Sequence, residues 1–299
     1  MIIVRLNGGL GNQLFQYAAG KALAIKNNDV LKIDVTVYDQ AANQKQIFRN
    51  LDITDFLISA PQASVNEVLS LKYPFGSISK FFKVINQKLF SRYYVDWHPE
   101  ILQKKGSIYL DGYFQTEKYF VENKEAIFKE FTLQPRLIQE IQSNIEEIES
   151  KKTSVSLHIR RGDYADDPKT SKLHLVCDIS YYERAISFML ERFPGLHLFV
   201  FSDDPDWVRE HLPTSAPLTF VSTGKGDKNR FRPSQELALM SKCHHHILSN
   251  SSFSWWGAYL NSSRHKVVLA PNVWNKGSSP QPNVLPMDWL AFPVLQDGK

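Results

Sequence analysis

The sequence has little of what marks secreted, membrane-spanning or nucleic-acid-binding chains. Its two cysteines, Cys177 and Cys243, are too few for a disulfide scaffold. No run approaches the ~20 consecutive apolar residues that a bilayer-spanning helix needs, and residues 1–6 are too short a run for a signal peptide. The net charge of +4 comes without a basic stripe, which argues against a nucleic-acid partner. We therefore expect a cytoplasmic protein, whose mild positive charge favours either the approach of an anionic ligand or loose contact with an acidic membrane surface.

What the sequence does contain is an alternation of apolar runs and amphipathic stretches. In the first half it predicts strands at residues 2–6, 30–35 and 107–110, and helices after Asn12 and near residues 65–71, 78–90, 117–130 and 135–149. In the second half it predicts strands at residues 155–160, 197–202, 217–222, 245–249 and 266–270, separated by helices at about 180–192, 205–211, 234–242 and 253–262. This spacing is typical of a parallel, doubly wound sheet. The predicted fold class is α/β, with two Rossmann-like domains, residues 1–152 and 153–299, facing each other across a cleft.

A glycine-rich loop joins the first predicted strand to its helix. Gly9 and Gly11 lie in this loop, where glycine permits positive φ and lets a ligand approach the backbone. The helix N-terminus behind the loop favours an anion. The dinucleotide pattern G-x-G-x-x-G fails, because Leu14 stands where the third glycine belongs. NAD is therefore disfavoured, and either a phosphate-bearing ligand or a tight turn without a ligand fits the loop.

Two adjacent arginines end the most regular strand of the second half. Residues 158–164 read HIRRGDY, so Arg160 and Arg161 follow an alternating apolar run. Guanidinium groups match phosphate oxygens with two hydrogen bonds and stay charged at any working pH. Because open α/β sheets bind ligands at the carboxyl ends of their strands, we expect a phosphate site here. The plainer alternative is a salt-bridged surface loop, and the tripeptide RGD within the motif is read as a coincidence.

Two polar segments follow neighbouring predicted strands of the same half. Asp203, Asp204 and Pro205 suit the start of a helix, where the carboxylates cap and proline occupies the first turn. Asp203 is also a candidate contact to a nucleotide base or ribose, because it lies at the same sheet edge. Ser251 and Ser252 precede another helix, and hydroxyls beside free helix N–H groups can hold phosphate without a metal.

Three consecutive histidines and a tryptophan pair surround this serine loop. His244, His245 and His246 enter a predicted strand, where neighbouring side chains point to opposite faces and cannot converge on one ion. We therefore expect no metal site. Trp255 and Trp256 are predicted to pack between helix and sheet, and not to stack on a base.

Together these motifs resemble the α-1,2-fucosyltransferases of glycosyltransferase family 11. The motifs that carry the resemblance, in the family's order, are RLNGGLGNQLFQYA from Arg5, DGYFQTEKYF from Asp111, HIRRGDY from His158, FSDDPDWV from Phe201 and ELALMSKCHHHILSNSSFSWWGAYL from Glu236. The resemblance implies a GT-B-like fold and transfer of L-fucose from GDP-β-L-fucose, with inversion, to the 2-hydroxyl of a terminal galactose. It also implies that no cofactor and no divalent metal are needed.

The resemblance also implies roles for single residues of the donor site. Arg160 would bind the donor pyrophosphate, helped by Ser251 and Ser252, and is a catalytic candidate because it would stabilise the departing β-phosphate. His158 and Glu236 would contact guanine or ribose, although many relatives carry Asp where this chain has Glu236. The predicted donor-binding set is completed by three further residues, Gly9, Gly11 and Asp203. Asn12 is a second catalytic candidate, near the donor phosphate or the reacting sugar.

The general base and the acceptor are less clearly indicated. Asp163 is the first candidate for the base that takes the acceptor proton, although it could equally pair with a neighbouring arginine. The reserve candidates are Asp166, Asp167 and Asp34. An oxocarbenium-like transition state could also manage with a weak base, the proton leaving late or directly to phosphate. The acceptor-binding candidates, which follow a predicted strand end, are Tyr113, Phe114 and Gln115.

Two alternative functions remain open at this point. The HxRRGD pattern is shared with α-1,6- and protein O-fucosyltransferases, but the first and last motifs argue against those linkages. A nucleotide- or glycan-binding protein without catalysis is the other alternative, and the full set of phosphate-binding groups argues against it. The expected partners are GDP-fucose and a galactose-terminated glycan, with peripheral membrane contact if that acceptor is lipid-linked.

Overall fold

The chain divides into two compact units, each built on its own parallel sheet. The computed structural model describes residues 1–41, 50–73, 97–161, 177–222, 230–274 and 283–294. The first unit comprises Met1–Thr132 and the second Leu133–Lys299. The boundary expected from the sequence lay between residues 152 and 153. The difference arises because two helices, α6 (Pro135–Glu140) and α7 (Gln142–Glu149), belong to the second unit, where α7 packs on α12 (Pro233–Lys242).

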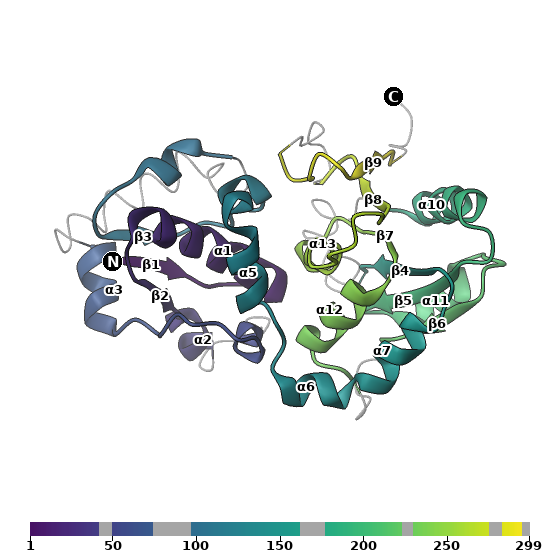
Figure 1. Cartoon of the computed structure of the whole chain (residues 1–299), viewed down its shortest axis with the longest axis horizontal. Coiled ribbons are helices and arrows are strands. Elements are labelled where there is room, and N and C mark those ends of the chain that lie inside the picture. Colours follow the sequence, from purple (N-terminus) through teal and green to yellow (C-terminus); the bar gives the residue numbers. More distant parts are fainter. Residues whose placement is uncertain (42–49, 74–96, 162–176, 223–229, 275–282, 295–299) are drawn as a thin grey trace. The chain divides into compact units, whose positions relative to one another are not determined.

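The first unit is built around a three-stranded parallel sheet. Its strands are β1 (Ile2–Arg5), β2 (Leu31–Asp34) and β3 (Ile108–Leu110), in the order β2-β1-β3. Helix α1 (Leu10–Asn27) connects β1 to β2 and packs on the sheet (Figure 1). A Cβ on Gly20 of α1 would lie 3.0 Å from side-chain atoms of Val4 and Leu31, so the helix backbone lies directly against the strands. This is the β-α-β start that the sequence predicted.

Short helices complete the first unit. They are α2 (Thr36–Ala41), η1 (Asp52–Asp55), α3 (Val65–Lys72), η3 (Pro99–Gln103), η4 (Glu117–Tyr119), η5 (Val121–Asn123) and α5 (Lys124–Glu130). The predicted helix at residues 65–71 is α3, which begins with a capping box between Ser64 and Glu67. The helix predicted at residues 117–130 is instead η4, η5 and α5, because the buried Tyr119 and Phe120 turn into the core between them. The helix predicted at residues 78–90 lies outside the described residues.

The second unit contains a six-stranded parallel sheet. Its order is β6-β5-β4-β7-β8-β9, with bounds β4 (Ser154–Ile159), β5 (His197–Ser202), β6 (Leu218–Phe220), β7 (His245–Ile247), β8 (Val268–Pro271) and β9 (Leu290–Phe292). The connecting helices are α10 (Ile179–Arg192), α11 (Pro205–His211), α12 and α13 (Ser252–Tyr259). All pairs are parallel. The predicted α/β class and the strand positions are therefore confirmed, and β9 is an additional edge strand.

The central strand β4 is buried on both faces. Val155, Leu157 and Ile159 belong to a core cluster that includes Tyr181 and Met189 of α10. The alternate residues of β4 are Ser154, Ser156 and His158, and they are buried as well. Burial on both faces is typical of a parallel sheet with helices on each side.

Helices α12 and α13 pack closely against each other, and α12 also packs on β5. Gly257 of α13 has no side chain, and a Cβ there would overlap Sδ of Met240 on α12. Trp255 and Trp256 are fully buried, and the Trp255 Nε1–H donates to the carbonyl oxygen of Val284 at 2.9 Å. Both rings are therefore interior, which agrees with the prediction that they pack inside the fold, while their placement between helix and sheet stays a prediction.

Cys177 and Cys243 are both buried free thiols. Within the described ranges, no helix combines the length and the apolar character needed to cross a membrane.

Candidate functional site

The carboxyl ends of β4 and β5 bring an arginine and an aspartate together. The two strands pair in register up to Ile159 and Ser202, so Arg160 and Asp203 follow as neighbours. Nε of Arg160 lies 3.1 Å from Oδ2 of Asp203. The backbone N–H of Arg161 donates to Oδ1 of the same carboxylate at 2.8 Å. Asp203 therefore fixes both the side chain of Arg160 and the backbone that follows it.

The two adjacent arginines have different surroundings. The guanidinium carbon of Arg161 lies 3.8 Å from the centre of the Trp207 ring, and its Nε lies 3.7 Å from Oδ2 of Asp204. Asp204 also accepts a hydrogen bond from the Trp207 N–H at 3.2 Å as the N-cap of α11, which confirms the predicted cap. Arg161 is thus held on α11. Both arginines are salt-bridged, as the plainer alternative expected. Of the two, Arg161 also stacks on Trp207, and Arg160 pairs with Asp203 where β4 and β5 end.

His158 is a buried, neutral imidazole beside Arg160. Its Nδ1 lies 2.7 Å from Oγ of Ser249, and its ring centre lies 5.6 Å from that of Phe253. Burial and the nearby charge of Arg160 lower the pKa of His158 to about 3, although Asp203 acts in the opposite direction. The ring is therefore uncharged at neutral pH. It can donate or accept a hydrogen bond without adding charge to the site.

Glu236, in the first turn of α12, is the second residue of the site whose pKa is shifted far from its ordinary value. Burial raises the pKa of Glu236 to about 7, with a contribution in the same direction from Asp203. Arg230 and a hydrogen bond with Ser222 act in the opposite direction. At neutral pH this carboxyl group is close to half protonated, so it can both donate and accept hydrogen bonds.

The serine loop after β7 leads into the N-terminus of α13. Ser251 is the N-cap, and its side chain accepts a hydrogen bond from the Phe253 N–H at 3.3 Å. The loop is fixed by Asn250, which donates to the carbonyl oxygen of Trp274 at 3.1 Å. Ser252 begins the helix. The hydroxyl groups and the positive end of α13 therefore follow the carboxyl end of β7, the strand next to β4. This arrangement favours an anionic ligand.

In the first unit, the glycine loop brings Asn12 and Gln115 together. Oδ1 of Asn12 accepts a hydrogen bond from Nε2 of Gln115 at 2.8 Å, a contact that no sequence pattern indicated. Gly8 has a φ of +79°, and a Cβ there would lie 2.8 Å from Nδ2 of Asn12. Gly9 is the N-cap of α1, and a Cβ added to it would meet no atom beyond its chain neighbours within 4 Å. A ligand could therefore approach at Gly9, whereas Gly11 is buried in the first turn of α1.

The other two acceptor candidates occupy different environments. Phe114 has a φ of +53° and is 6% exposed, and its ring packs edge-on against Tyr119 with centres 5.3 Å apart. Its ring is therefore part of the packing of the unit and offers little surface to a sugar. Tyr113 is half-buried. Gln115 is half-buried as well, beside Asn12.

Of the base candidates, Asp34 can be placed in the structure. Asp34 accepts hydrogen bonds from the Tyr109 hydroxyl at 2.5 Å and from the N–H and hydroxyl of Thr36. Burial acts to raise the pKa of Asp34, but these hydrogen bonds outweigh it and lower the pKa. A carboxylate so engaged is a weak proton acceptor. The other candidates, Asp163, Asp166 and Asp167, lie outside the described residues.

The three histidines make structural hydrogen bonds or ring contacts. Nδ1 of His244 lies 2.7 Å from Oγ of Ser154, and Nδ1 of His246 lies 2.7 Å from Oγ of Ser156. The ring of His245 stacks on Phe193. The neighbouring side chains have separate partners, as expected from strand alternation. Among the described residues, no group of three or more potential metal ligands is found.

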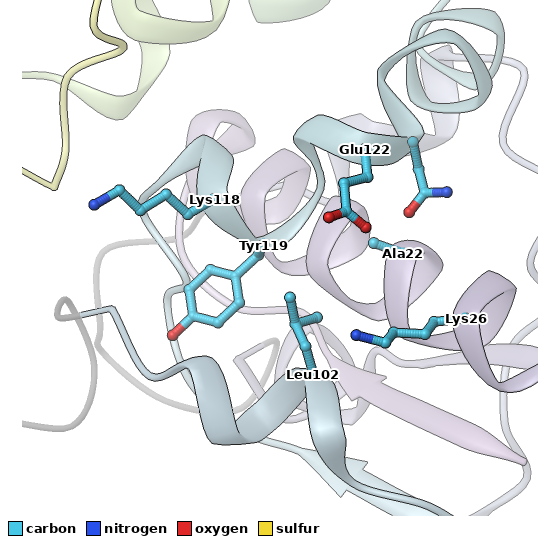
Figure 2. A pocket seen from close by; sticks show the side chains of 7 residues that line it. Ala22, Lys26, Leu102, Lys118, Tyr119 and Glu122 are labelled. Atoms are coloured by element: carbon cyan, nitrogen blue, oxygen red, sulfur yellow. The ribbon is translucent and has the colours of Figure 1, made fainter.

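A depression of about 150 Å³ in the first unit is lined by side chains beside the C-terminal half of α1. Ala22 and Lys26 of α1 line it together with Lys118, Tyr119 and Glu122. Figure 2 shows Lys118 extending away from the other labelled side chains, so the two lysines do not converge on one point. Because the glycine loop precedes the opposite end of α1, this depression is separate from Asn12.

Sequence reasoning missed three residues of the second unit that contact the predicted site residues. Trp207 holds Arg161, Ser249 holds His158, and Ser222 contacts Glu236. Trp207 lies within the FSDDPDWV segment and Ser249 begins the serine loop, so position alone could have drawn attention to them. Ser222 has no such signal.

The described groups offer a cation, neutral donors and helix N–H groups at one sheet edge, which suits a diphosphate leaving group.

Comparison with known proteins gives a consistent family. The profile of Glycosyl transferase family 11 matches residues 1–289. An α-1,2-colitosyltransferase of Escherichia coli is 33% identical over 284 residues, which cover 92% of each chain. The O-antigen biosynthesis glycosyltransferase WbnK of Escherichia coli is 28% identical over 92% of this chain and 95% of its own length. Human galactoside α-(1,2)-fucosyltransferase 1 is 26% identical over 85% of this chain and 64% of its own length.

Solved structures support the fold. The crystal structure of fucosyltransferase NodZ from Bradyrhizobium superposes with a TM-score of 0.56 at 14% identity, covering 86% of this chain and 92% of NodZ. NodZ soaked with GDP-fucose gives a TM-score of 0.55 at 15% identity, covering 93% and 96%. The GT-B-like class is thereby confirmed, while the cleft between the two domains stays a prediction. With the family profile matching almost every residue, the chain belongs to glycosyltransferase family 11 and is a glycosyltransferase.

Proposed function

We propose that the protein transfers L-fucose from GDP-β-L-fucose, with inversion, to the 2-hydroxyl of a terminal galactose in a glycan. The observation that carries the proposal is the ion pair at the carboxyl edge of the second sheet, where Asp203 holds Arg160 at 3.1 Å beside the neutral His158. The names of the relatives support it, because colitosyl- and fucosyltransferases with α-1,2 linkage recur among them.

The proposed mechanism places the donor diphosphate against Arg160. As the bond between fucose and GDP breaks, negative charge grows on the β-phosphate, and a positioned guanidinium stabilises that charge most in the transition state. Ser251, Ser252 and the N-terminus of α13 add neutral donors to the same edge. In this proposal these protein groups do the work that a divalent metal does in other transferases, so the reaction needs no metal and no cofactor.

Other predicted residues keep supporting roles in the proposal. His158 and Glu236 contact guanine or ribose, with Asp203 nearby, and the open space at Gly9, in place of the buried Gly11, lets a phosphate approach the glycine loop. Asn12, held by Gln115, contacts the donor phosphate or the reacting sugar. Tyr113 and Gln115 remain the acceptor candidates with exposed surface. Asp163 remains the proposed base, and its substitution by asparagine should lower kcat if it takes the acceptor proton.

The decisive experiment offers GDP-fucose with a panel of galactose-terminated acceptors, with and without chelator. We expect an α-1,2-linked product, and unchanged transfer in the presence of chelator. Arg160→Ala should lower kcat/KM by about 10²–10³-fold, on the scale of one lost oxyanion donor. Arg136→Ala is the matched control, because this arginine of the same unit is 72% exposed and pairs with Glu140 on its own helix. Near-normal turnover by Arg160→Ala would refute the assignment.

A second candidate concerns the sugar that is transferred. The α-1,2-colitosyltransferase is 33% identical to this chain, against 26% for human galactoside α-(1,2)-fucosyltransferase 1. An activated colitose donor therefore belongs in the same assay, and the ratio of kcat/KM values identifies the preferred sugar. Linkage analysis of the product separates α-1,2 transfer from the α-1,6 activity named for NodZ. Binding of GDP without any turnover would favour a binding protein instead.

The cellular setting is part of the proposal. The O-antigen name of WbnK supports a precursor of a surface polysaccharide as acceptor. We infer a cytoplasmic enzyme that contacts the inner face of the membrane through a lipid-linked acceptor. Fractionation of cells with and without that acceptor tests this, because membrane association should depend on it.

A further inference from the structure

Strands β4 and β7 are joined by a row of serine–histidine hydrogen bonds. The register pairs Ser156 with His246, so alternate residues of the two strands face each other across one side of the sheet. Three contacts of equal length, 2.7 Å between ring Nδ1 and serine Oγ, form the row: His244 with Ser154, His246 with Ser156, and His158 with Ser249. The last pair lies at the carboxyl edge, beside Arg160.

The middle pair is closed within the protein. Nε2 of His246 lies 2.9 Å from Nδ2 of Asn261, and its Nδ1 lies 2.7 Å from Ser156. Because an amide nitrogen can only donate, Nε2 accepts and Nδ1 carries the proton. Ser156 and His246 are both fully buried. Both ring nitrogens of His246 are therefore used in holding the fold.

The pair at the edge has the opposite proton arrangement. Ser249 is 1% exposed, and Nδ1 of His158 is the one partner of its hydroxyl among the described residues. If Nδ1 carried the proton, the buried O–H of Ser249 would have no acceptor among the described residues, which is unfavourable. Ser156 bears that cost because Asn261 donates to Nε2 of His246, whereas no donor to Nε2 of His158 is found in the described part of the chain. The hydroxyl therefore donates to Nδ1, and the proton of the neutral ring is on Nε2.

We propose that Ser249 is a positioning residue that fixes His158 in its Nε2–H form, so that the buried ring donates one hydrogen bond to an acceptor atom of the donor nucleotide. The inference rests on the proposed function for the identity of that nucleotide. The geometry behind this is that one ring nitrogen is committed to Ser249, while the ring centre lies 5.6 Å from that of Phe253 in α13 and Arg160 follows two residues later on the same strand end. Loss of the serine hydroxyl lets the ring change tautomer and rotate.

The test uses the full chain with GDP as the probe. Ser249→Ala should weaken GDP binding about tenfold by calorimetry, on the scale of one buried hydrogen bond. Ser249→Thr, which keeps the hydroxyl, should recover most of the affinity. Ser156→Ala is the matched control, because it removes an equally buried serine from the same row at the same distance. It should lower stability and leave GDP affinity within about twofold of the wild type, since a structural bond away from the edge does not touch the nucleotide.

Nitrogen NMR of ¹⁵N-histidine-labelled protein reports the tautomer of His158, which would not change if Ser249 only stabilised the fold. The His158 signals, assigned by their loss in His158→Gln, should show the Nε2–H form in the wild type and a changed tautomer balance in Ser249→Ala. If Ser249→Ala does not fold, Ser249→Cys keeps the volume with a weaker donor and takes its place. Wild-type signals of the Nδ1–H form, or unchanged GDP affinity and unchanged signals in the variant, overturn the inference.

The two ideas can fail separately. A wild type that binds GDP but transfers no fucose defeats the proposed function, while the affinity series still decides the role of Ser249. A wild type that binds no GDP defeats the nucleotide contact. If the wild type transfers fucose and Ser249→Ala keeps its GDP affinity and its His158 signals, the proposed function stands and the positioning role of Ser249 is refuted.

Discussion

At the scale of single residues, Arg160 and Arg161 show how two neighbours in the sequence acquire different roles. Arg161 lies over the ring of Trp207 and pairs with Asp204, whereas Arg160 pairs with Asp203 at the centre of the strand ends. A lysine can replace the charge of either, but it lacks the planar fork that matches a phosphate with two hydrogen bonds. The two lysine variants should therefore differ.

We expect Arg160→Lys to lower kcat/KM by about 100-fold and Arg161→Lys by less than about tenfold, because the proposed function gives only Arg160 a bidentate contact with the diphosphate. The second loses the planar stacking of the guanidinium on Trp207, which should weaken a contact worth ~1 kcal/mol to the fold. Steady-state kinetics and urea unfolding of the two variants provide the comparison. A larger kinetic loss for Arg161→Lys would show that the roles of the two arginines are reversed.

Glu236 makes stability depend on pH. Its pKa is about 7 in the folded chain against an ordinary 4.5, so the folded state binds more protons between these values. The contribution of Glu236 to stability is greatest below about pH 4.5, and it falls as the pH rises to about 7. The fall is at most ~3 kcal/mol, since each pKa unit corresponds to about 1.36 kcal/mol.

Substitution of Glu236 by glutamine should remove this part of the pH dependence. We expect the variant to be more stable than the wild type at about pH 7.5 and similar to it at about pH 4.5, because glutamine stays neutral at both. Urea unfolding at both pH values measures the difference, and subtracting the two proteins cancels the titration of all other carboxyl groups. Parallel curves for the two proteins would mean that the Glu236 carboxyl titrates normally.

At the scale of elements, the contact between α12 and α13 holds two parts of the site in place. Helix α12 carries Glu236, and α13 begins at Ser252. Their close approach depends on Gly257, since a Cβ there would overlap Met240. We expect Gly257→Ala to lower the unfolding free energy by about 1–3 kcal/mol, the usual cost of overpacking a core.

A double-mutant cycle isolates this contact. Met240→Ala alone should cost about 2–5 kcal/mol by leaving a cavity. In the double variant, the methyl group introduced at position 257 enters that space, so the combined loss should be smaller than the sum by about 1 kcal/mol or more. Strictly additive losses would show that the two positions do not press on each other.

At the scale of the whole molecule, the two compact units each have a sheet of their own. The cation, the perturbed histidine and the hydroxyl-bearing helix start all lie in the second unit. A ligand that binds the native state stabilises the region that it contacts. We therefore expect GDP to slow amide hydrogen exchange at residues 158–161 and 249–254.

The amides in the interior of the first unit serve as the internal reference for that experiment. Exchange at β1 and β2 should change little on addition of GDP, because those strands are already buried and lie in the other unit. Protection confined to the first unit would move the nucleotide site away from Arg160.

Much of the fold followed from local patterns. The helices expected at residues 180–192 and 205–211 are α10 (Ile179–Arg192) and α11 (Pro205–His211). Apolar periodicity and capping residues determine such boundaries. Edge strand β9 was not predicted, because its residues are largely exposed and carry no alternating signal. The division of residues 117–130 into three short helices was missed, because the segment contains no helix-breaking residue. The helix is interrupted where two adjacent aromatic rings, Tyr119 and Phe120, are buried.

The sequence by itself determined the α/β class, the sheet edge that carries the candidate site and the residue types found there, since motif, period and cap are properties of neighbouring residues. Tertiary structure alone decided that Arg161 rests on Trp207, that Ser249 meets His158 from 91 residues away, and that Asn12 meets Gln115. It also decided which side chains have shifted pKa values. Burial and charges from distant residues cause such shifts, and neighbouring residues in the sequence reveal neither of these causes.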